Sequence, residues 1–357
     1  MPLNMATKYI RKAYTNFTTH IYDVPPRMLA FLILVILAAV PFAGINLLKL
    51  DILTAANLMA ILAVSWDLLV GRTGQISLGH AIFYAAGAYG TALLFKYFNW
   101  PIWVTIPLSL LCGVGIALII GIPSLRMKGP YLALVTMAVP LAITGFLYYF
   151  RDIFGGETGI RNLPKVFPSL TFFNRLIANY YLSLALMTIS SIIIYKIATS
   201  KTGIVFISIL DDELGAKACG INVTKYKLMS FAISGLFGSL AGSAYAHLMV
   251  GSASPSYLDF SNSIIPIIAT ILGGIGTIYG PLVGTYIYYL MNRYVFQELL
   301  PLDQTTQILL FIIVVLLFVI KWPRGIGRAI VEKLEDLEEP REIEEIEKER
   351  AKKAEKS

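Results

Sequence analysis

The stretch that decides the fold reads NSIIPIIATILGGIGTIYGPLVGTYIYYLMN over residues 262–292. It is apolar enough to enter a membrane, where a spanning helix needs about 20 mostly apolar residues. The run Gly273-Gly274-Ile275-Gly276 and the pair Gly280-Pro281 interrupt it. Irregular backbone at membrane depth is stable only where it is buried in protein or lines a cavity. The stretch therefore predicts two shorter helices, or a re-entrant hairpin, in place of one straight helix.

Other apolar runs of nearly spanning length lie before and after this stretch. The 357 residues are 57% hydrophobic and only 14% charged, and the mean hydropathy is +0.70. A soluble domain carries about a quarter charged residues, so the shortage of charge points to a membrane protein. We predict an all-α polytopic membrane protein with about 8–10 transmembrane helices. The predicted spans are 28–48, 53–70, 79–97, 101–122, 130–150, 178–197, 228–250 and 304–322.

Charge is divided unevenly along the chain. Half of the 22 acidic residues lie in 331–357, which leaves the preceding part strongly basic. Its basic residues flank apolar runs, as at a cytoplasmic membrane face, and this excludes a nucleic-acid-binding role. We expect a cytoplasmic leader (1–27), a transmembrane domain (28–330) and a charged cytoplasmic tail (331–357) in the cell (inner) membrane. One observation opposes this orientation: the predicted external segment 151–177 carries Arg151, Arg161, Lys165 and Arg175.

A polar, glycine-rich segment, GRTGQISLGH, occupies residues 71–80 between two apolar runs. Polar groups inside a membrane tend to face a bundle interior or a pathway, which makes Gln75, Ser77 and His80 candidate pathway residues. The alternative is a turn in which Ser77 caps a helix that begins near Leu78. The two readings are compatible, and both stay open.

Glycines also gather in the interrupted stretch. Gly276, Gly280 and Gly284 recur every four residues and are expected to share one helical face, where another backbone could approach closely. The break at Gly273-Gly274 instead favours a discontinuous helix, whose exposed ends can bind a zwitterionic substrate. Gly273, Gly274 and Gly276 are therefore candidate pathway residues. For a second series, Gly235, Gly238 and Gly242, we favour tight helix packing.

The loop 198–227 is the longest polar loop between predicted helices. Its middle predicts a short amphipathic helix that is opened by acids, where the helix dipole favours them, and closed by Gly220. Such a helix could dock into a groove of another protein. An ordinary capped connection explains the pattern equally well. The candidate contact residues are Asp211, Asp212, Glu213, Gly215, Ala216 and Gly220.

Several functional motifs are absent from the sequence. There is no Walker A loop, so ATP binding of the usual kind is not expected. There is no HExxH, CxxC or regularly spaced arginine helix, so we expect no enzyme, metal site, cofactor or voltage sensor. Cys112 and Cys219 have no neighbours that suggest a disulfide.

Six segments, taken in order over residues 71–327, resemble the permease family of branched-chain amino-acid ABC importers, and in particular the longer of its two permease subunits. They are GRTGQISLGHAIFYAAGAYG (71–90), LRMKGPYLALVTMA (125–138), GGETGI (155–160), DDELGAKACGINVTKYKLMSFAISGLFGSLAGSAYA (211–246), ILGGIGTIYGPLVG (271–284) and WPRGIG (322–327).

The resemblance implies a transport subunit with several partners. These would be a second permease subunit, two cytoplasmic ATPase subunits and an external substrate-binding protein that delivers branched-chain or related amino acids. It also implies that the segment 211–222 is the ATPase-coupling helix. The chain departs from the family at Ile204 and Leu210, where arginines are usual, and in its long acidic tail.

Two other functions stay open. A urea or short-amide importer shares the same segments. A stand-alone ion-coupled transporter would need a buried acid, and Asp67 is the only acid within the predicted spans.

Overall fold

The computed structural model describes residues 34–35, 37–43, 47–124, 127, 130–292, 304–322 and 325–326. The chain divides into two units, Met1–Ala43 with Arg328–Ser357, and Gly44–Gly327. In the first unit, the 3-10 helix η1 spans Val40–Ala43. The predicted leader 1–27, about half of the predicted helix 28–48 and the charged tail 331–357 lie outside the described residues.

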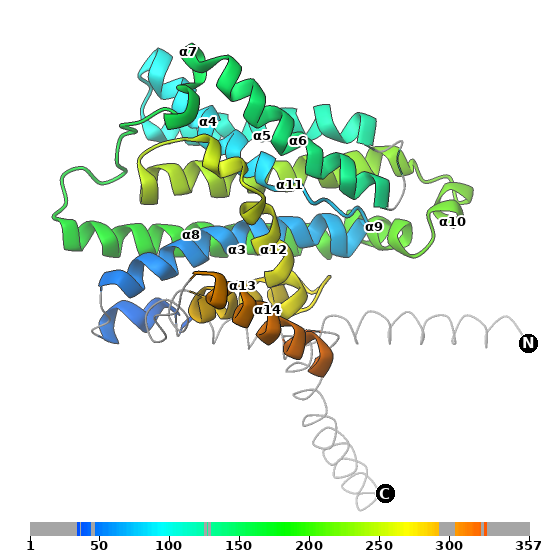
Figure 1. The fold of residues 1–357 in the computed structure, drawn as a ribbon. Helices are drawn as coiled ribbons and strands as arrows, with labels where there is room; N and C mark the ends of the chain where they lie inside the picture. The colour runs from blue at the N-terminus through cyan, green and yellow to red at the C-terminus, as the bar shows by residue number, and fades with distance from the viewer. Residues whose placement is uncertain are drawn as a thin grey trace, which may run out of the picture. The chain divides into compact units, whose positions relative to one another are not determined.

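The second unit is built from helices (Figure 1). No strand occurs among the described residues, apart from an isolated bridge between Ile160 and Ala253. The long helices are α3 (Leu47–Thr73), α4 (Ala81–Phe98), α5 (Ile102–Ser124), α6 (Pro130–Tyr149), α8 (Phe172–Ala198), α11 (Val223–Tyr245) and α14 (Gln304–Lys321). The shorter elements are α7 (Arg151–Phe154), η2 (Gly156–Thr158), α9 (Lys201–Asp211), α10 (Glu213–Ala218), the π-helix η3 (Ala246–Val250), η4 (Pro255–Leu258), α12 (Phe260–Gly273) and α13 (Tyr279–Tyr289).

Five described helices are long and apolar enough to cross a membrane. They are Leu50–Thr73, Ile102–Pro123, Pro130–Tyr149, Phe172–Ala198 and Val223–Val250. Each overlaps a predicted span along most of its length, so the expectation of an all-α polytopic membrane protein is confirmed.

Helix α3 lies at the centre and packs against α8, α11, α12 and α13. Of its most apolar window, 89% is buried inside the protein, compared with 28% for the windows of α5 and α6. The exposed side chains of α5 and α6 include Leu111, Ile119 and Leu141. A helix that is apolar on all sides yet exposed is suited to lipid, so α5 and α6 form part of the lipid-facing surface.

The helices α4, α5 and α11 pack closely because glycines line their contacts. A Cβ on Gly242 would collide with the backbone carbonyl of Tyr84, and one on Gly235 would lie 2.7 Å from the carbonyl oxygen of Gly113. Without a Cβ at these positions the helix backbones approach directly. The predicted packing role of this glycine series is thus confirmed.

Three helices begin well before the predicted residue. Helix α3 begins at Leu47, α8 at Phe172 and α11 at Val223, all earlier than expected. Polar residues in these first turns lower the local hydropathy and end an apolar run, whereas a helix needs only its backbone hydrogen bonds and packing to continue. The expectation that Asp67 is the only acid in a span is therefore wrong, because α3 also contains Asp51.

The glycine-broken stretch forms two short helices, as predicted. Helix α12 has 14 residues, so at 1.5 Å per residue it is shorter than the roughly 30 Å hydrocarbon core, and α13 has 11 residues. They pack against each other, and a Cβ on Gly284 would collide with the carbonyl of Ala269. Gly276 does not share the helical face of Gly280 and Gly284, because it lies in the break with φ of 79°.

Candidate functional site

The break between α12 and α13, which we call the hairpin tip (Gly274–Ile278), is held by a fully buried acid of α3. The backbone N–H of Gly276 donates to Oδ1 of Asp67 (2.6 Å), and the N–H of Ile278 donates to Oδ2 (3.1 Å). Ile278 has φ of 62°, a conformation that is unfavourable for a β-branched residue. Such strain persists only where surrounding contacts hold it. Asp67 supplies two of those contacts.

Glycines from three predicted segments meet at the hairpin tip. A Cβ on Gly71, at the end of α3, would lie 2.6 Å from the backbone nitrogen of Gly276. A Cβ on Gly325 would collide with the backbone of Gly274. The segments around residues 71, 274 and 325 therefore touch backbone to backbone, which side chains would prevent.

The segment Gly74–His80, which we call the crossing segment, joins α3 to α4 without helical structure and is largely buried. Gln75, Ser77 and His80 are each at most 2% exposed. The prediction that Ser77 caps a helix is wrong: α4 begins at Ala81, and the carbonyl of Ser77 accepts a hydrogen bond from Trp66 Nε1 (2.7 Å).

Hydroxyls of distant helices satisfy the backbone at the end of this segment. The N–H of Leu78 donates to Thr136 Oγ1 of α6 (3.1 Å), and the N–H of Ala81 donates to Ser263 Oγ of α12 (3.0 Å). These hydroxyls accept hydrogen bonds from backbone N–H groups that a local helix cap would otherwise satisfy. The crossing segment is therefore fixed to both α6 and α12.

His80 joins α3 to α11. Its Nε2 lies 3.0 Å from Ser65 Oγ and 3.3 Å from Ser234 Oγ. Both hydroxyls already donate to carbonyl oxygens, of Leu62 and Ser65 respectively, so Nε2 must carry the hydrogen and donate to them. In the part of the chain that the structure describes, no group of three or more His, Cys, Asp or Glu residues could hold a metal ion.

The predicted amphipathic helix is α10, and local interactions define it. Asp212 is its N-cap, and Oδ1 accepts from the N–H of Leu214 (2.9 Å). Gly220, with φ of 81°, follows its C-terminus. Asp211 differs from the prediction, since it ends α9 and does not open α10. The loop thus contains two helices where one was expected.

Glu213 ties α10 to the first turns of α11. It accepts from Lys217 (2.8 Å) and from Lys227 (2.7 Å). The hydrogen bonds from Lys217 and then Lys227 lower the pKa of Glu213 to about 2. Glu213 therefore stays ionised at physiological pH and keeps both contacts.

An apolar cluster completes this attachment. Ile209, Ala216 and Val223, from α9, α10 and α11, are buried together. Leu214, in contrast, is 70% exposed on the other side of α10. Ile204 and Leu210, where the family usually has arginines, are also exposed on α9. The helices α9 and α10 with the start of α11 form one packed body, the coupling unit (Lys201–Lys227), which presents an apolar residue outward.

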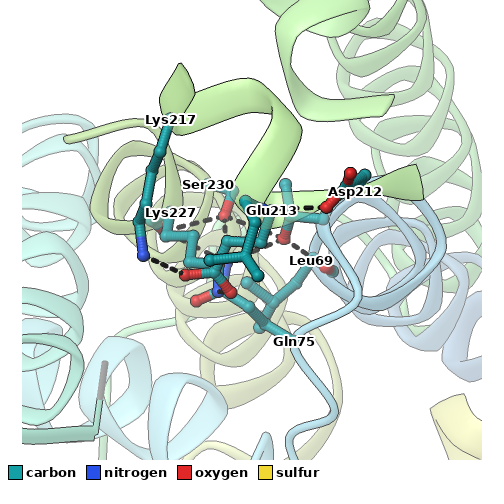
Figure 2. Close-up of polar contacts among 9 residues, drawn as sticks. Leu69, Gln75, Asp212, Glu213, Lys217, Lys227 and Ser230 are labelled. Carbon is teal, nitrogen blue, oxygen red and sulfur yellow. Dashed lines mark hydrogen bonds and ion pairs between the residues drawn. The ribbon is translucent and has the colours of Figure 1, made fainter. Parts of the chain in front are cut away.

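The coupling unit also touches the crossing segment (Figure 2). Gln75 Nε2 donates to Ser230 Oγ (2.9 Å) and to the carbonyl of Lys227 (3.3 Å). One predicted pathway residue and one predicted coupling residue, Gln75 and Glu213, are thus connected through the first turns of α11. The predicted glycines of the tip are connected to α3 instead, through Asp67.

Comparison with known proteins now decides the family. The profile described as branched-chain amino acid transport system / permease component matches residues 48–320. The chain belongs to this permease family.

Relatives of the permease are named for different substrates. The high-affinity branched-chain amino acid transport system permease protein LivM of Salmonella typhimurium is 30% identical over 71% of this chain and 65% of its own length. The fructose import permease protein FrcC of Rhizobium meliloti is 27% identical over 72% of this chain and 69% of its own. The match thus spans about 65% of the length of LivM. No solved structure matches the permease.

Sequence reasoning missed the partners of the site residues. Thr136, Ser263, Lys227 and Ser230 were not singled out, and Asp67 was considered only as evidence about ion coupling. Single hydroxyls and lysines carry no motif, and their partners lie far away in sequence. Asp67 alone gave a signal, because an acid inside an apolar run is rare and usually functional.

A cluster of tyrosines was missed as well. The ring centroids of Tyr84 and Tyr257 are 5.0 Å apart, and Tyr245 lies within 6 Å of both. Tyr245 directly precedes the π-helix η3, a type of irregularity that is frequent at functional sites. The buried hydroxyl of Tyr84 has no hydrogen-bond partner among the described residues.

Proposed function

We propose that this permease forms part of the translocation pathway of an ATP-driven importer for branched-chain or related amino acids. An external binding protein delivers the substrate, a second permease subunit completes the pathway, and two cytoplasmic ATPase subunits power the cycle, with α10 as this chain's docking helix. The observation that carries the proposal is the coupling unit: a capped, exposed helix that is fastened to the buried helix α11 by Glu213 and an apolar cluster.

The ends of α11 support the proposed orientation. The coupling unit lies at its N-terminal end, while the segment after α7 lies at the other end, where Ile160 pairs with Ala253 and His247 bonds to the carbonyl of Pro164. Figure 1 shows α10 and this segment on opposite sides of the unit. A cytoplasmic coupling unit and an external 151–177 segment agree with this arrangement. The cytoplasmic placement of both termini is a further part of the proposal. The division into 1–27, 28–330 and 331–357 is part of the same proposal.

The bonding of Asp67 argues against an ion-coupled secondary transporter. Both of its oxygens accept backbone hydrogen bonds from the hairpin tip. An ion-coupling acid must exchange its proton or cation during transport, whereas this acid holds a strained turn.

Affinity purification from mild detergent tests the ATPase attachment. The tagged permease should retain an ATPase pair and ATPase activity. Replacing Asp212 and Glu213 by alanine removes the α10 cap, worth about 1 kcal/mol, together with both ion pairs, and should release the ATPase. Asp152→Ala, which removes an exposed acid of α7, is the matched control and should retain it. A wild-type permease that purifies alone and moves substrate without ATP would overturn the proposal.

The substrate class needs a separate measurement, because sugar permeases are also similar to this chain. Uptake of radiolabelled leucine into proteoliposomes containing the complex and ATP should be reduced by unlabelled valine. It should not be reduced by urea or fructose. Inhibition by urea would favour the alternative, a urea or short-amide importer.

A further inference from the structure

A continuous line of polar contacts joins α10 to the crossing segment (Figure 2). It begins with the ion pair between Glu213 and Lys227 (2.7 Å). The carbonyl of Lys227 accepts from the hydroxyl of Ser230 (2.8 Å), and Gln75 Nε2 donates to both residues. Between residues each step is a hydrogen bond or an ion pair, and within Lys227 the side chain joins Nζ to the backbone carbonyl, so a movement of α10 has a path to Gln75 through Lys227 of α11.

The hydroxyls around Gln75 fix the orientation of its amide. The hydroxyl of Thr73 donates to the carbonyl of Leu69 (2.6 Å), and that of Ser230 donates to the carbonyl of Lys227. Both hydroxyl oxygens therefore remain as acceptors, and the amide must present Nε2 to them. Its Oε1 is buried without a partner among the described residues.

An apolar contact lies beside this polar line. Leu210 of α9 packs against Gly74, with Cδ1 3.0 Å from the place of a Cβ on that glycine. The coupling unit thus contacts two successive residues of the crossing segment, Gly74 and Gln75. Its own helices are held together by the buried cluster of Ile209, Ala216 and Val223, so it can move as one body.

We propose that Gln75 is the positioning residue through which a displacement of α10 reaches the crossing segment. This inference rests on the proposed function. The coupling unit holds the segment at Gln75 through the carbonyl of Lys227, while α6 holds it at Leu78 and α12 holds the adjoining Ala81 of α4. Movement of the unit therefore changes the direction in which the segment runs between α3 and α4, and this couples ATP hydrolysis to the pathway.

The test compares transport and ATP hydrolysis in the complete complex in proteoliposomes, with radiolabelled leucine and the cognate binding protein outside. Gln75→Leu has similar size and removes both donors, while Ser230 and Thr73 keep their bonds to carbonyl oxygens. We expect assembly and ATP hydrolysis to persist while leucine transported per ATP falls about fivefold, which corresponds to the loss of the hydrogen bond from Gln75 to Ser230 alone. Ser190→Ala is the matched control, because the hydroxyl of Ser190 is buried without a partner among the described residues. The leucine transported per ATP should not change in this variant.

The outcomes separate the inference from the proposed function. A Gln75→Leu complex with the wild-type ratio overturns the inference and leaves the proposed function standing. A wild-type protein that binds no ATPase overturns the proposed function itself. If Gln75→Leu does not assemble, Ser230→Ala decides, because it removes one acceptor of the amide. A lowered ratio then supports the inference, and a normal ratio overturns it.

Discussion

Replacing Asp67 by asparagine should loosen the hairpin tip without unfolding the bundle. The two oxygens of Asp67 accept the N–H groups of Gly276 and Ile278. Asparagine has similar shape but only one side-chain acceptor, and its NH2 group would face the remaining backbone N–H. One amide of the tip therefore loses its partner, and the other loses the charge of its acceptor.

The size of the effect follows from these two losses. A hydrogen bond to a charged group contributes about 1.5–3 kcal/mol and a neutral one about 1 kcal/mol, while a buried unpaired N–H costs about 1–3 kcal/mol. We expect the free energy of local opening of the tip to fall by about 2–3 kcal/mol. Amide exchange there should accelerate by about 30- to 150-fold, since about 1.4 kcal/mol corresponds to a factor of ten.

Hydrogen–deuterium exchange with mass spectrometry in nanodiscs measures this directly, on peptides that cover the tip. Asp51→Asn is the matched control: Asp51 lies on the same helix, is half-buried and has no side-chain hydrogen bond within the described part of the chain. Exchange at the tip in Asp67→Asn within about twofold of wild type would refute the reasoning, because the carboxylate would then not be what holds the turn.

Three further predictions rest on single contacts. The pKa of Glu213 is lowered from its ordinary value of 4.5 to about 2. The carboxylate therefore stabilises the folded protein fully above about pH 4.5, and this stabilisation is lost as the pH falls toward about 2. The melting temperature of wild type should thus exceed that of Glu213→Gln equally at pH 6 and pH 8, and the difference should shrink below about pH 4.5; an unchanged difference at pH 3 contradicts this. Gly71→Ala places a methyl carbon 2.6 Å from the backbone of the hairpin tip and should lower the free energy of unfolding by about 1–3 kcal/mol. Gly115→Ala, whose methyl would meet nothing within 4 Å, should leave that free energy unchanged or raise it by up to about 1 kcal/mol. Tyr84→Phe removes a hydroxyl that has no partner among the described residues and should not lower the melting temperature. Tyr257→Phe removes a hydroxyl that donates to the carbonyl of Ser252 (3.1 Å) and should lower the free energy of unfolding by about 1 kcal/mol. Equal losses of stability in the two variants would contradict this difference in hydrogen bonding.

The elements that the sequence predicted well depend on local information. Apolar runs located the spanning helices, because lipid exposure demands a continuous apolar surface. The break at Gly273–Gly274 was predicted because glycine and Pro281 act on their own backbone. Asp212 and Gly220 delimit α10 for the same reason.

The elements that it predicted badly depend on distant partners. Ser77 was one candidate cap for the helix after it, but Ser263 of α12 accepts from the N–H of Ala81 across the bundle. Helix α3 begins earlier than its apolar run, because polar residues such as Lys49 and Asp51 end the run without ending the helix. The contact between Gln75 and Ser230 joins residues 155 positions apart, and no local pattern marks it.

Two sets of contacts begin close together at the end of α3: those of Asp67 with the hairpin tip and those of Gln75 with α11. Asp67 holds the hairpin tip, and Gln75, two residues beyond the end of α3 at Thr73, holds the first turns of α11. The contacts of Gln75 do not involve Asp67, so the two substitutions should give different signatures. Asp67→Asn should expose the tip while the line from Glu213 to Gln75 stays intact. Gln75→Leu should lower transport per ATP while the tip stays protected. If either variant showed both effects, the end of α3, the tip and the crossing segment would open as one cooperative unit, and displacement of α10 would have to reach the hairpin as well as the crossing segment.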